Sequence, residues 1–375
     1  MPLAEIAESF FKPAVRDIVP YEPGKPVEEV QRELGLERVV KLASNEGPFG
    51  PFPAAREALA RGLPELNRYP DGGCYRLRAA LAERHGVRFE EVALGAGADG
   101  VIDCLAQVAL EPGNEIVVGW PSFPSPVIDA LKLGAVARQI PLRNGRYDLD
   151  AMLESVGSRT KLVYVCHPNN PTSTSNTRAE LDDFFGRVPD HVLTVLDQAY
   201  FEYVDDPDYP DGVEEYLKQG ARVIVLRTFS KIYGLAGLRV GYGVGPTAVA
   251  TAIGKVRRAF DVNQQAQDAA LASIDDTQEI ERRRRANADQ RTRVEQALRE
   301  HGFEPAGPAV GNFVFAEVGD DSRPLFELLL REGVIVRPTH GFGAPGAIRV
   351  TVGTAEENAI FAEALGRVTA RAQVA

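Results

Sequence analysis

The strongest constraint on the fold is the alternation of short apolar runs with helical patterns between residues 53 and 260. Apolar runs of strand length lie near 91–94, 115–119, 135–140, 161–166, 192–197, 222–227 and 239–244. Helical patterns lie near 53–61, 74–85, 99–110, 124–133, 148–156, 177–187 and 213–219. Such alternation is typical of α/β proteins. We therefore predict a large domain with a mostly parallel seven-stranded sheet between layers of helices.

The rest of the chain follows a different pattern. A long polar helix is predicted near 262–300, and its basic run, Arg282 to Arg285, is interpreted as a solvated face. Strands near 312–317, 334–337 and 347–352, a helix near 323–331 and a closing helix predict a smaller α+β domain. A chain of 375 residues is long enough for two domains. We predict an N-terminal arm and part of the small domain (1–50), a large domain (51–262) and a small C-terminal domain (263–375).

The stretch after the apolar run at 222–227 carries the most reactive side chains. Lys231 lies there with Thr228, Ser230 and Arg239, just past a predicted strand end. Open α/β sheets bind their ligands at such ends. The two hydroxyls and the guanidinium could hold a phosphate group. A lysine amine forms Schiff bases with aldehydes, so Lys231 is a candidate nucleophile, although an exposed lysine is the simpler alternative.

Two neighbouring strand ends add complementary groups. Asp197 ends one apolar run and is followed by Tyr200, and Asn170 follows another run in a proline-fixed turn. A buried carboxylate is costly without a cationic partner. Pyridoxal phosphate needs a Schiff-base lysine, an anion facing its ring nitrogen, phosphate donors and a flat partner for its ring. Asp197 suits that nitrogen, although it could instead cap the next helix, and Tyr200 and Asn170 suit the ring oxygen.

Two further stretches fit the same cofactor. Gly97, Ala98 and Asp99 open a predicted helix, whose first N–H groups can bind phosphate. Trp120 and Phe123 follow another strand and can offer an aromatic face to a pyridine ring. A Gly-x-Gly pattern alone is weak, but four strand ends with complementary groups together predict a pyridoxal phosphate site.

The chain resembles the fold-type I pyridoxal phosphate aminotransferases of the histidinol-phosphate aminotransferase family. The matching stretches lie at 41–46, 67–72, 95–99, 168–172, 197–200, 228–231, 234–239 and 348–353, in the order of the family, within residues 15–360. Gly47 stands where this family usually has Asn, and Ser173 where it usually has Gly. Ser173 and the 119–123 stretch also resemble actinobacterial aromatic aminotransferases.

This resemblance implies roles for further residues. It makes Lys231 the catalytic base and acid, with Asp197 and Tyr200 assisting, and it puts Phe123 against the cofactor ring. It implies a homodimer with shared active sites, in which Tyr69 binds the neighbour's cofactor phosphate and Tyr21 touches the neighbour's substrate. It also places Asn45 near the substrate.

The substrate anion has two candidate ligands in the small domain. Arg337 and Arg349 lie in or beside apolar strands, where two guanidinium groups form a ready anion site. Either the phosphate of histidinol phosphate or the carboxylate of an aromatic amino acid could bind there. We predict transamination between histidinol phosphate and 2-oxoglutarate, as in histidine biosynthesis. Phenylalanine or tyrosine as donor, a decarboxylase such as a threonine-phosphate decarboxylase, and a non-catalytic regulator are the alternatives.

Composition narrows the possible partners. The net charge of −11, without a long basic stretch, argues against nucleic acid. The three scattered cysteines fit reduced thiols in a cytoplasm, and the five histidines show no metal-binding spacing. No apolar stretch is long enough for a membrane span or placed as a signal peptide. We therefore predict a cytoplasmic enzyme with no metal and no membrane partner.

Overall fold

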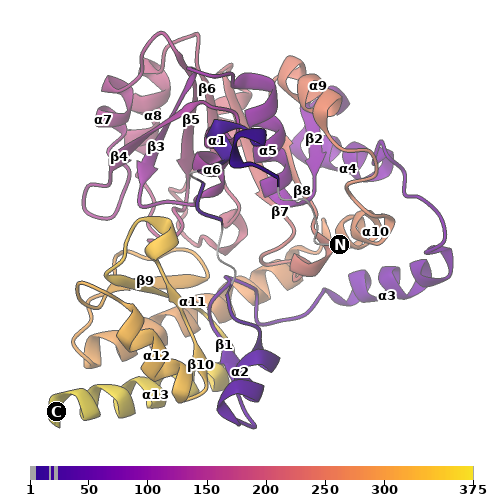
Figure 1. The fold of residues 1–375 in the computed structure, drawn as a ribbon. Coiled ribbons are helices and arrows are strands. Elements are labelled where there is room, and N and C mark those ends of the chain that lie inside the picture. Colours follow the sequence, from indigo (N-terminus) through magenta and orange to yellow (C-terminus); the bar gives the residue numbers. More distant parts are fainter. Residues whose placement is uncertain (1–5, 17, 21–23, 375) are drawn as a thin grey trace.

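The computed structural model describes residues 6–16, 18–20 and 24–374 (Figure 1). Its larger part is a seven-stranded sheet with helices on both faces, and its smaller part contains the last strands and helices of the chain. The predicted α/β fold class is therefore confirmed. Tyr21, the predicted ligand of the neighbour's substrate, lies outside the described residues.

The large sheet has the strand order β2-β8-β7-β6-β5-β3-β4. In that order the strands are β2 (Val92–Gly95), β8 (Gly241–Val244), β7 (Val223–Thr228), β6 (Leu193–Asp197), β5 (Thr160–Cys166), β3 (Glu115–Trp120) and β4 (Val136–Pro141). β8 runs antiparallel to both of its neighbours, and the other pairs are parallel. Every residue of β7 is buried, which explains the apolar run from Val223 to Leu226, because helices cover both faces of such sheets.

Helices flank this sheet close to their predicted positions. They are α3 (Pro53–Gly62), α4 (Tyr75–His85), α5 (Gly97–Ala109), α6 (Ser125–Lys132), α7 (Leu149–Glu154), α8 (Arg178–Arg187), α9 (Thr247–Val256) and α10 (Gln264–Ser273). Short helical turns are η2 (Leu63–Glu65), η3 (Phe89–Glu91), η4 (Phe201–Tyr203) and η6 (Ala236–Leu238). The segment predicted as a helix near 213–219 forms one π-helical turn, η5 (Val213–Leu217). The helix α9 was not predicted.

The smaller part contains two short sheets. β1 (Val40–Lys41) pairs in parallel with β10 (Val334–Ile335), and β11 (Arg337–Pro338), β12 (Ala347–Thr351) and β9 (Phe313–Glu317) form an antiparallel sheet. Its helices are α2 (Val27–Leu34), α11 (Thr277–Glu300), α12 (Arg323–Arg331) and α13 (Ala355–Val374), with the turn η7 (His340–Phe342). The arm contains η1 (Glu8–Phe10) and α1 (Pro13–Arg16). The pairing of β1 with β10 joins a segment near the N-terminus to this part of the molecule.

The single long helix predicted near 262–300 is wrong in one respect, since it is broken at 274–276. The Asp276 side chain accepts a hydrogen bond from the Glu279 N–H at 3.0 Å and caps α11. Ala270 and Ile274 pack in the core around the large sheet, whereas Val294 and Leu298 pack in the core of the smaller part. α11 therefore has residues in both cores, and the division of the chain at 262/263 stays a prediction.

The basic run of α11 is only partly solvated. Arg283 is buried and donates to the carbonyls of Ile232 at 3.0 Å and Gly50 at 2.8 Å. Its Nε also bonds Glu279 at 2.8 Å. Successive residues of a helix point in different directions, so one arginine of a basic run can face another part of the protein while its neighbours face solvent. The basic run by itself does not show which arginine is buried. No helix in the described ranges is both long and apolar enough to cross a membrane.

Candidate active site

One cavity, of about 150 Å³, gathers most of the predicted site residues. It lies at the carboxyl ends of β5, β6 and β7, beside the first turn of α5. The predicted residues that line it are Asn45, Gly97, Ala98, Asp99, Phe123, Asn170, Asp197, Tyr200, Thr228, Ser230, Lys231, Arg239 and Arg349. They converge because the carboxyl ends of parallel strands share one edge of the sheet.

Lys231 lies three residues past the end of β7 and points into this cavity. Its amine donates to the Asn45 carbonyl at 3.4 Å and lies 5.2 Å from the centre of the Tyr200 ring. Burial, together with the nearby Arg349 and Arg239, lowers the pKa of Lys231 to about 8. A sizeable fraction of the amine is therefore unprotonated near neutral pH, as a nucleophile or general base requires.

Asp197 is buried at the end of β6. The Tyr164 hydroxyl donates to its Oδ2, and the Ala199 N–H donates to its Oδ1 at 3.0 Å. Burial raises the pKa of the Asp197 carboxyl, although these hydrogen bonds oppose the shift. The next helical turn, η4, has Tyr200 as its N-cap, so capping by Asp197 is not its role. The carboxylate is suited to a cationic group bound in the cavity.

A third group of side chains forms a set of donors beside the first turn of α5. The Thr228 and Ser230 hydroxyl oxygens are 3.1 Å apart, and Arg239 Nη1 donates to the Ser230 hydroxyl at 3.4 Å. Gly97 has a φ of +78°, and a Cβ there would lie 2.7 Å from Arg239 Nη2. Only glycine allows this close approach of the guanidinium to the helix N-terminus, where free N–H groups favour an anion.

The small sheet closes the other side of the cavity. Arg349 is buried; it donates to Asn170 Oδ1 and, at 2.7 Å, to the Ala43 carbonyl. Asn45 donates through its side-chain amide to the Tyr200 hydroxyl at 3.0 Å. Arg337 is the register partner of Arg349 across β11 and β12, but it does not line the cavity. The two predicted arginines are therefore neighbours in one sheet, and one of them reaches the site.

Tyr69 does not join the site within this chain. Its side chain is 84% exposed, and its ring stacks on Phe260 with 4.8 Å between centroids. The role predicted for Tyr69 belongs to a neighbouring subunit, so it stays a prediction.

Sequence reasoning missed several residues around the cavity. Ser44, Cys166 and Phe342 line it, and Tyr164 holds Asp197 from the neighbouring strand. Tyr164 had a usable signal, because a tyrosine within an otherwise aliphatic buried strand needs a partner for its hydroxyl. Phe342 had none, since it ends the short turn η7 in a distant part of the chain.

The fold and this cavity define a class of protein: an α/β protein with a buried lysine amine in a cavity at the carboxyl edge of its sheet. Residues 37–365 match the family model for aminotransferase class I and II, and the chain belongs to that family. The predicted aminotransferase class is thereby confirmed.

Individual relatives agree with this assignment. A protein of Moorella thermoacetica named histidinol-phosphate aminotransferase is 45% identical, and the alignment covers 95% of this chain and 92% of that protein. Histidinol-phosphate aminotransferase 2 of Pseudomonas fluorescens is 44% identical, with 96% and 98% covered. The predicted resemblance to the histidinol-phosphate aminotransferases is confirmed.

Solved structures show the same fold. The histidinol-phosphate aminotransferase of Sinorhizobium meliloti, in complex with pyridoxal 5'-phosphate, superposes with a TM-score of 0.87 at 27% identity, and the match covers 97% of this chain and 99% of that one. A Thermus thermophilus aspartate aminotransferase double mutant superposes with a TM-score of 0.83 at 24% identity, with 96% and 99% covered, and so bears on the fold alone.

Proposed function

We propose that this protein transfers the amino group of histidinol phosphate to 2-oxoglutarate, with pyridoxal 5'-phosphate as its cofactor. The products would be imidazole acetol phosphate and glutamate. The observation that carries this proposal is the extent of the similarity: relatives that bear this enzyme's name match nearly the whole chain. Their identity of 44–45% extends over both the large sheet and the smaller part that carries Arg337 and Arg349.

The donor set of the cavity fits pyridoxal phosphate. Asp197, buried and facing the cavity, suits a protonated ring nitrogen, and Tyr200 with Asn170 suits the ring hydroxyl. Phe123 offers a flat partner for the ring. The first turn of α5 (Gly97, Ala98 and Asp99), together with Thr228, Ser230 and Arg239, offers donors to the phosphate.

In this proposal Lys231 does the proton chemistry. When bound, the cofactor supplies an aldehyde that combines with amines and a ring that accepts an electron pair. The Lys231 amine, with its pKa of about 8, takes the proton from the substrate Cα and returns it. Arg349 holds the anionic group of the substrate, and Asn45 fixes the Tyr200 hydroxyl.

We further propose a cytoplasmic homodimer with shared sites. Apolar side chains are exposed in the segment around Tyr69, including Leu63, Leu66 and Phe260. Such a cluster on a protein surface is typical of an interface. A second copy that covers this segment would receive Tyr69 at its own cofactor phosphate. The three cysteines are unpaired thiols and are buried, which suits a reducing compartment.

An aromatic amino acid is the second candidate donor. Phe342 lines the cavity, and the Arg349 guanidinium carbon lies 5.1 Å from the centre of its ring. An arginine beside an aromatic face could bind a carboxylate and an aromatic side chain together. This arrangement favours phenylalanine or tyrosine over a decarboxylase substrate.

The deciding experiment compares kcat/KM for histidinol phosphate and phenylalanine under one set of conditions. We expect at least a tenfold preference for histidinol phosphate, or about 1.4 kcal/mol. A smaller ratio would replace histidinol phosphate with an aromatic donor. A half-reaction without 2-oxoglutarate is the control for reaction type: a transaminase accumulates pyridoxamine phosphate, whereas a decarboxylase releases carbon dioxide.

A further inference from the structure

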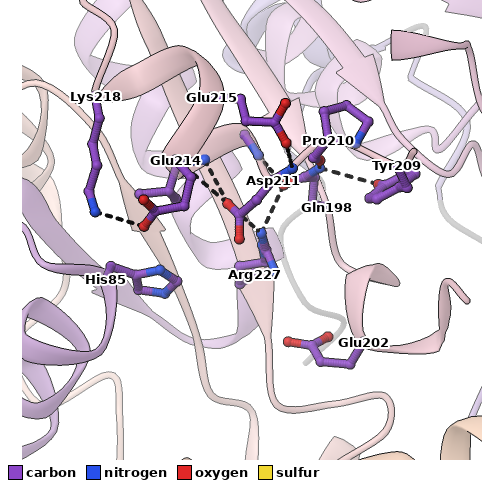
Figure 2. A network of polar contacts seen from close by, with 12 residues as sticks. His85, Gln198, Glu202, Tyr209, Pro210, Asp211, Glu214, Glu215, Lys218 and Arg227 are labelled. Atoms are coloured by element: carbon purple, nitrogen blue, oxygen red, sulfur yellow. Dashed lines mark hydrogen bonds and ion pairs between the residues drawn. The ribbon is translucent and has the colours of Figure 1, made fainter. Parts of the chain in front are cut away.

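A second polar cluster lies on the reverse side of the strand ends that form the cavity (Figure 2). Gln198 directly follows Asp197, the last residue of β6, and Arg227 directly precedes Thr228, the last residue of β7. Successive side chains of a strand point to opposite faces of the sheet. Gln198 and Arg227 therefore point away from the cavity, while the residue next to each of them lines it.

Arg227 is the centre of this cluster. It is buried, and its Nη2 donates to Gln198 Oε1 at 2.9 Å and to Asp211 Oδ1 at 3.2 Å. Its guanidinium carbon lies 3.4 Å from the centre of the Phe201 ring. The same Gln198 oxygen accepts the Gly212 N–H at 3.1 Å. One guanidinium thus ties the ends of β6 and β7 to the segment 209–212.

The cluster also reaches the end of β5. Gln198 Nε2 donates to the Pro210 carbonyl at 2.8 Å and to the Tyr209 hydroxyl at 3.3 Å. Tyr209 in turn donates to the His167 carbonyl, and its ring stacks on the His167 ring with 4.6 Å between centroids. His167 begins the turn that carries Asn170. The ends of β5, β6 and β7, each with a residue that lines the cavity, are therefore linked on the side away from the cavity.

Close packing holds the segment 209–212 in place. A Cβ on Gly212 would lie 2.5 Å from Leu196 Cδ2 and 3.0 Å from Val225 Cγ2. The absence of a side chain there lets the segment lie directly on β6 and β7. Burial opposes ionisation of Asp211, but Arg227 and the backbone N–H of Val213 outweigh it and lower the pKa of this carboxyl.

Stability alone does not account for such a cluster. Burying a charge removes it from water, which costs free energy. Apolar residues of similar volume can often replace a buried ion pair without loss of stability. Networks of buried hydrogen bonds do, however, specify one arrangement of the groups that they join. In this cluster Arg227 Nη2 and both polar atoms of the Gln198 amide are bonded, whereas Arg227 Nε has no partner among the described residues.

We propose that Arg227, with Gln198 and Tyr209, is a positioning residue that sets the places of Asn170, Asp197 and Lys231 relative to one another. It touches neither substrate nor cofactor, and it acts through the backbone of the residues beside it. The inference rests on the proposed function, since it concerns the same cavity. Its physical basis is that a displacement of about 1 Å at reacting groups can lower a rate by about 10²-fold.

The test compares four holoenzymes: wild type, Arg227→Met, Tyr209→Phe and Arg138→Met. Arg138 is the control: its side chain is 44% exposed, and it bonds the buried Glu115 at 2.7 Å at the opposite end of the same sheet. The measurements are kcat, KM, the melting temperature and the visible circular dichroism band of the bound pyridoxal phosphate. That band reports the orientation of the cofactor ring and does not depend on turnover.

Arg227→Met should lower kcat by about 10²-fold, change KM less than kcat, and alter the dichroism band. Tyr209→Phe removes one hydroxyl and should lower kcat by up to about tenfold, the value of one hydrogen bond. Arg138→Met should lower the melting temperature and leave kcat and the band unchanged. If Arg227→Met does not fold, Tyr209→Phe decides the matter alone.

A wild-type kcat and band in both variants would overturn the inference, as would equal effects in Arg138→Met. Failure of the proposed function would instead show in the wild-type protein. If wild type binds pyridoxal phosphate but does not use histidinol phosphate, the dichroism bands of the variants still test the inference. If wild type does not bind the cofactor, both proposals fall.

Discussion

The two halves of the active-site cavity are built in different ways. The half that we propose for the cofactor consists of Asp197, Thr228, Ser230, Lys231 and Arg239, which lie at the end of β6 or between the end of β7 and the start of β8 and meet within one chain. The substrate half was predicted from Asn45, Arg337, Arg349 and Tyr21. Asn45 and Arg349 line the cavity, Arg337 does not, and Tyr21 lies outside the described residues.

This difference teaches what each half depends on. The cofactor half rests on the edge of a sheet, where hydrogen-bonded strands place successive ends at a fixed spacing. The substrate half depends on how β12 and the segment around Asn45 pack on the large sheet, and in our proposal on a second subunit. We therefore expect substitutions in the cofactor half to abolish chemistry and those in the substrate half to alter binding.

The largest effect should come from Lys231→Ala. This change removes the nucleophile and general base, so kcat should fall by at least about 10³-fold. Steady-state turnover measures the loss, and borohydride reduction followed by mass spectrometry should attach the cofactor to Lys231 in wild type only. Lys255→Ala, on the exposed side of α9, is the control. Near-normal turnover of Lys231→Ala would mean that Lys231 is not the catalytic lysine, and it would contradict the expected difference between the two halves.

The second-largest effect is on the free energy of unfolding, and its size depends on pH. The pKa of Lys231 is about 8 in the folded protein against an ordinary 10.5, so the unfolded chain binds more protons between these values. The charged amine therefore destabilises the cofactor-free fold below pH 8, and this penalty disappears as the pH rises toward 10.5.

Lys231→Met should accordingly raise the unfolding free energy of the cofactor-free protein at pH 7 by about 2 kcal/mol, a value reduced from the full shift because the amine borders the cavity. Urea unfolding at pH 7 and pH 9.5 measures this, and the difference from wild type should shrink at the higher pH. Lys255→Met should show no such trend. A gap that is independent of pH would mean that packing, and not charge, explains the gain.

A smaller effect is expected in the substrate half. Arg349→Lys keeps the positive charge near Lys231 but loses the forked geometry that binds two oxygens. We expect KM for the amino donor to rise about tenfold, the value of one charge-assisted hydrogen bond. The cofactor dissociation constant should stay near that of wild type. If cofactor binding weakens as much as donor binding does, the two halves are not separable at this residue.

The smallest signal is recovery of activity in mixed dimers. Lys231→Ala protein and Tyr21→Phe, Tyr69→Phe protein should each be inactive alone. In hybrids one site would combine an intact Lys231 with intact tyrosines, so random mixing should restore roughly one quarter of wild-type activity in an isologous dimer. Subunit exchange is verified with differently tagged chains. Exchange without recovery would mean that Tyr21 and Tyr69 do not act across the subunit interface.

Much of the large domain could be predicted from local pattern alone. The strands β3, β5, β6 and β7 begin and end within a residue or two of their predictions, because fully buried parallel strands require continuous apolar runs. The helix predicted across 274–276 shows the limit of such reasoning. By composition, Asp276 could belong to a polar helix. Its hydrogen bond to the Glu279 N–H, which caps α11, is seen only in the structure, where α11 packs against the core of the smaller part.

The sequence by itself determined the fold class, the aminotransferase family and the gathering of Asp197, Thr228 and Lys231 at one edge of the sheet, because these residues lie at or just past strand ends whose relative places a parallel sheet dictates. Only the tertiary structure decided that Tyr164 holds Asp197, that Arg349 and not Arg337 reaches the cavity, and that Arg227, Gln198 and Tyr209 together link three strand ends. Each of these contacts joins residues from separate strands or segments, and side-chain direction across such pairs depends on register and domain packing. Local composition determines neither the strand register nor the packing of the two parts of the molecule.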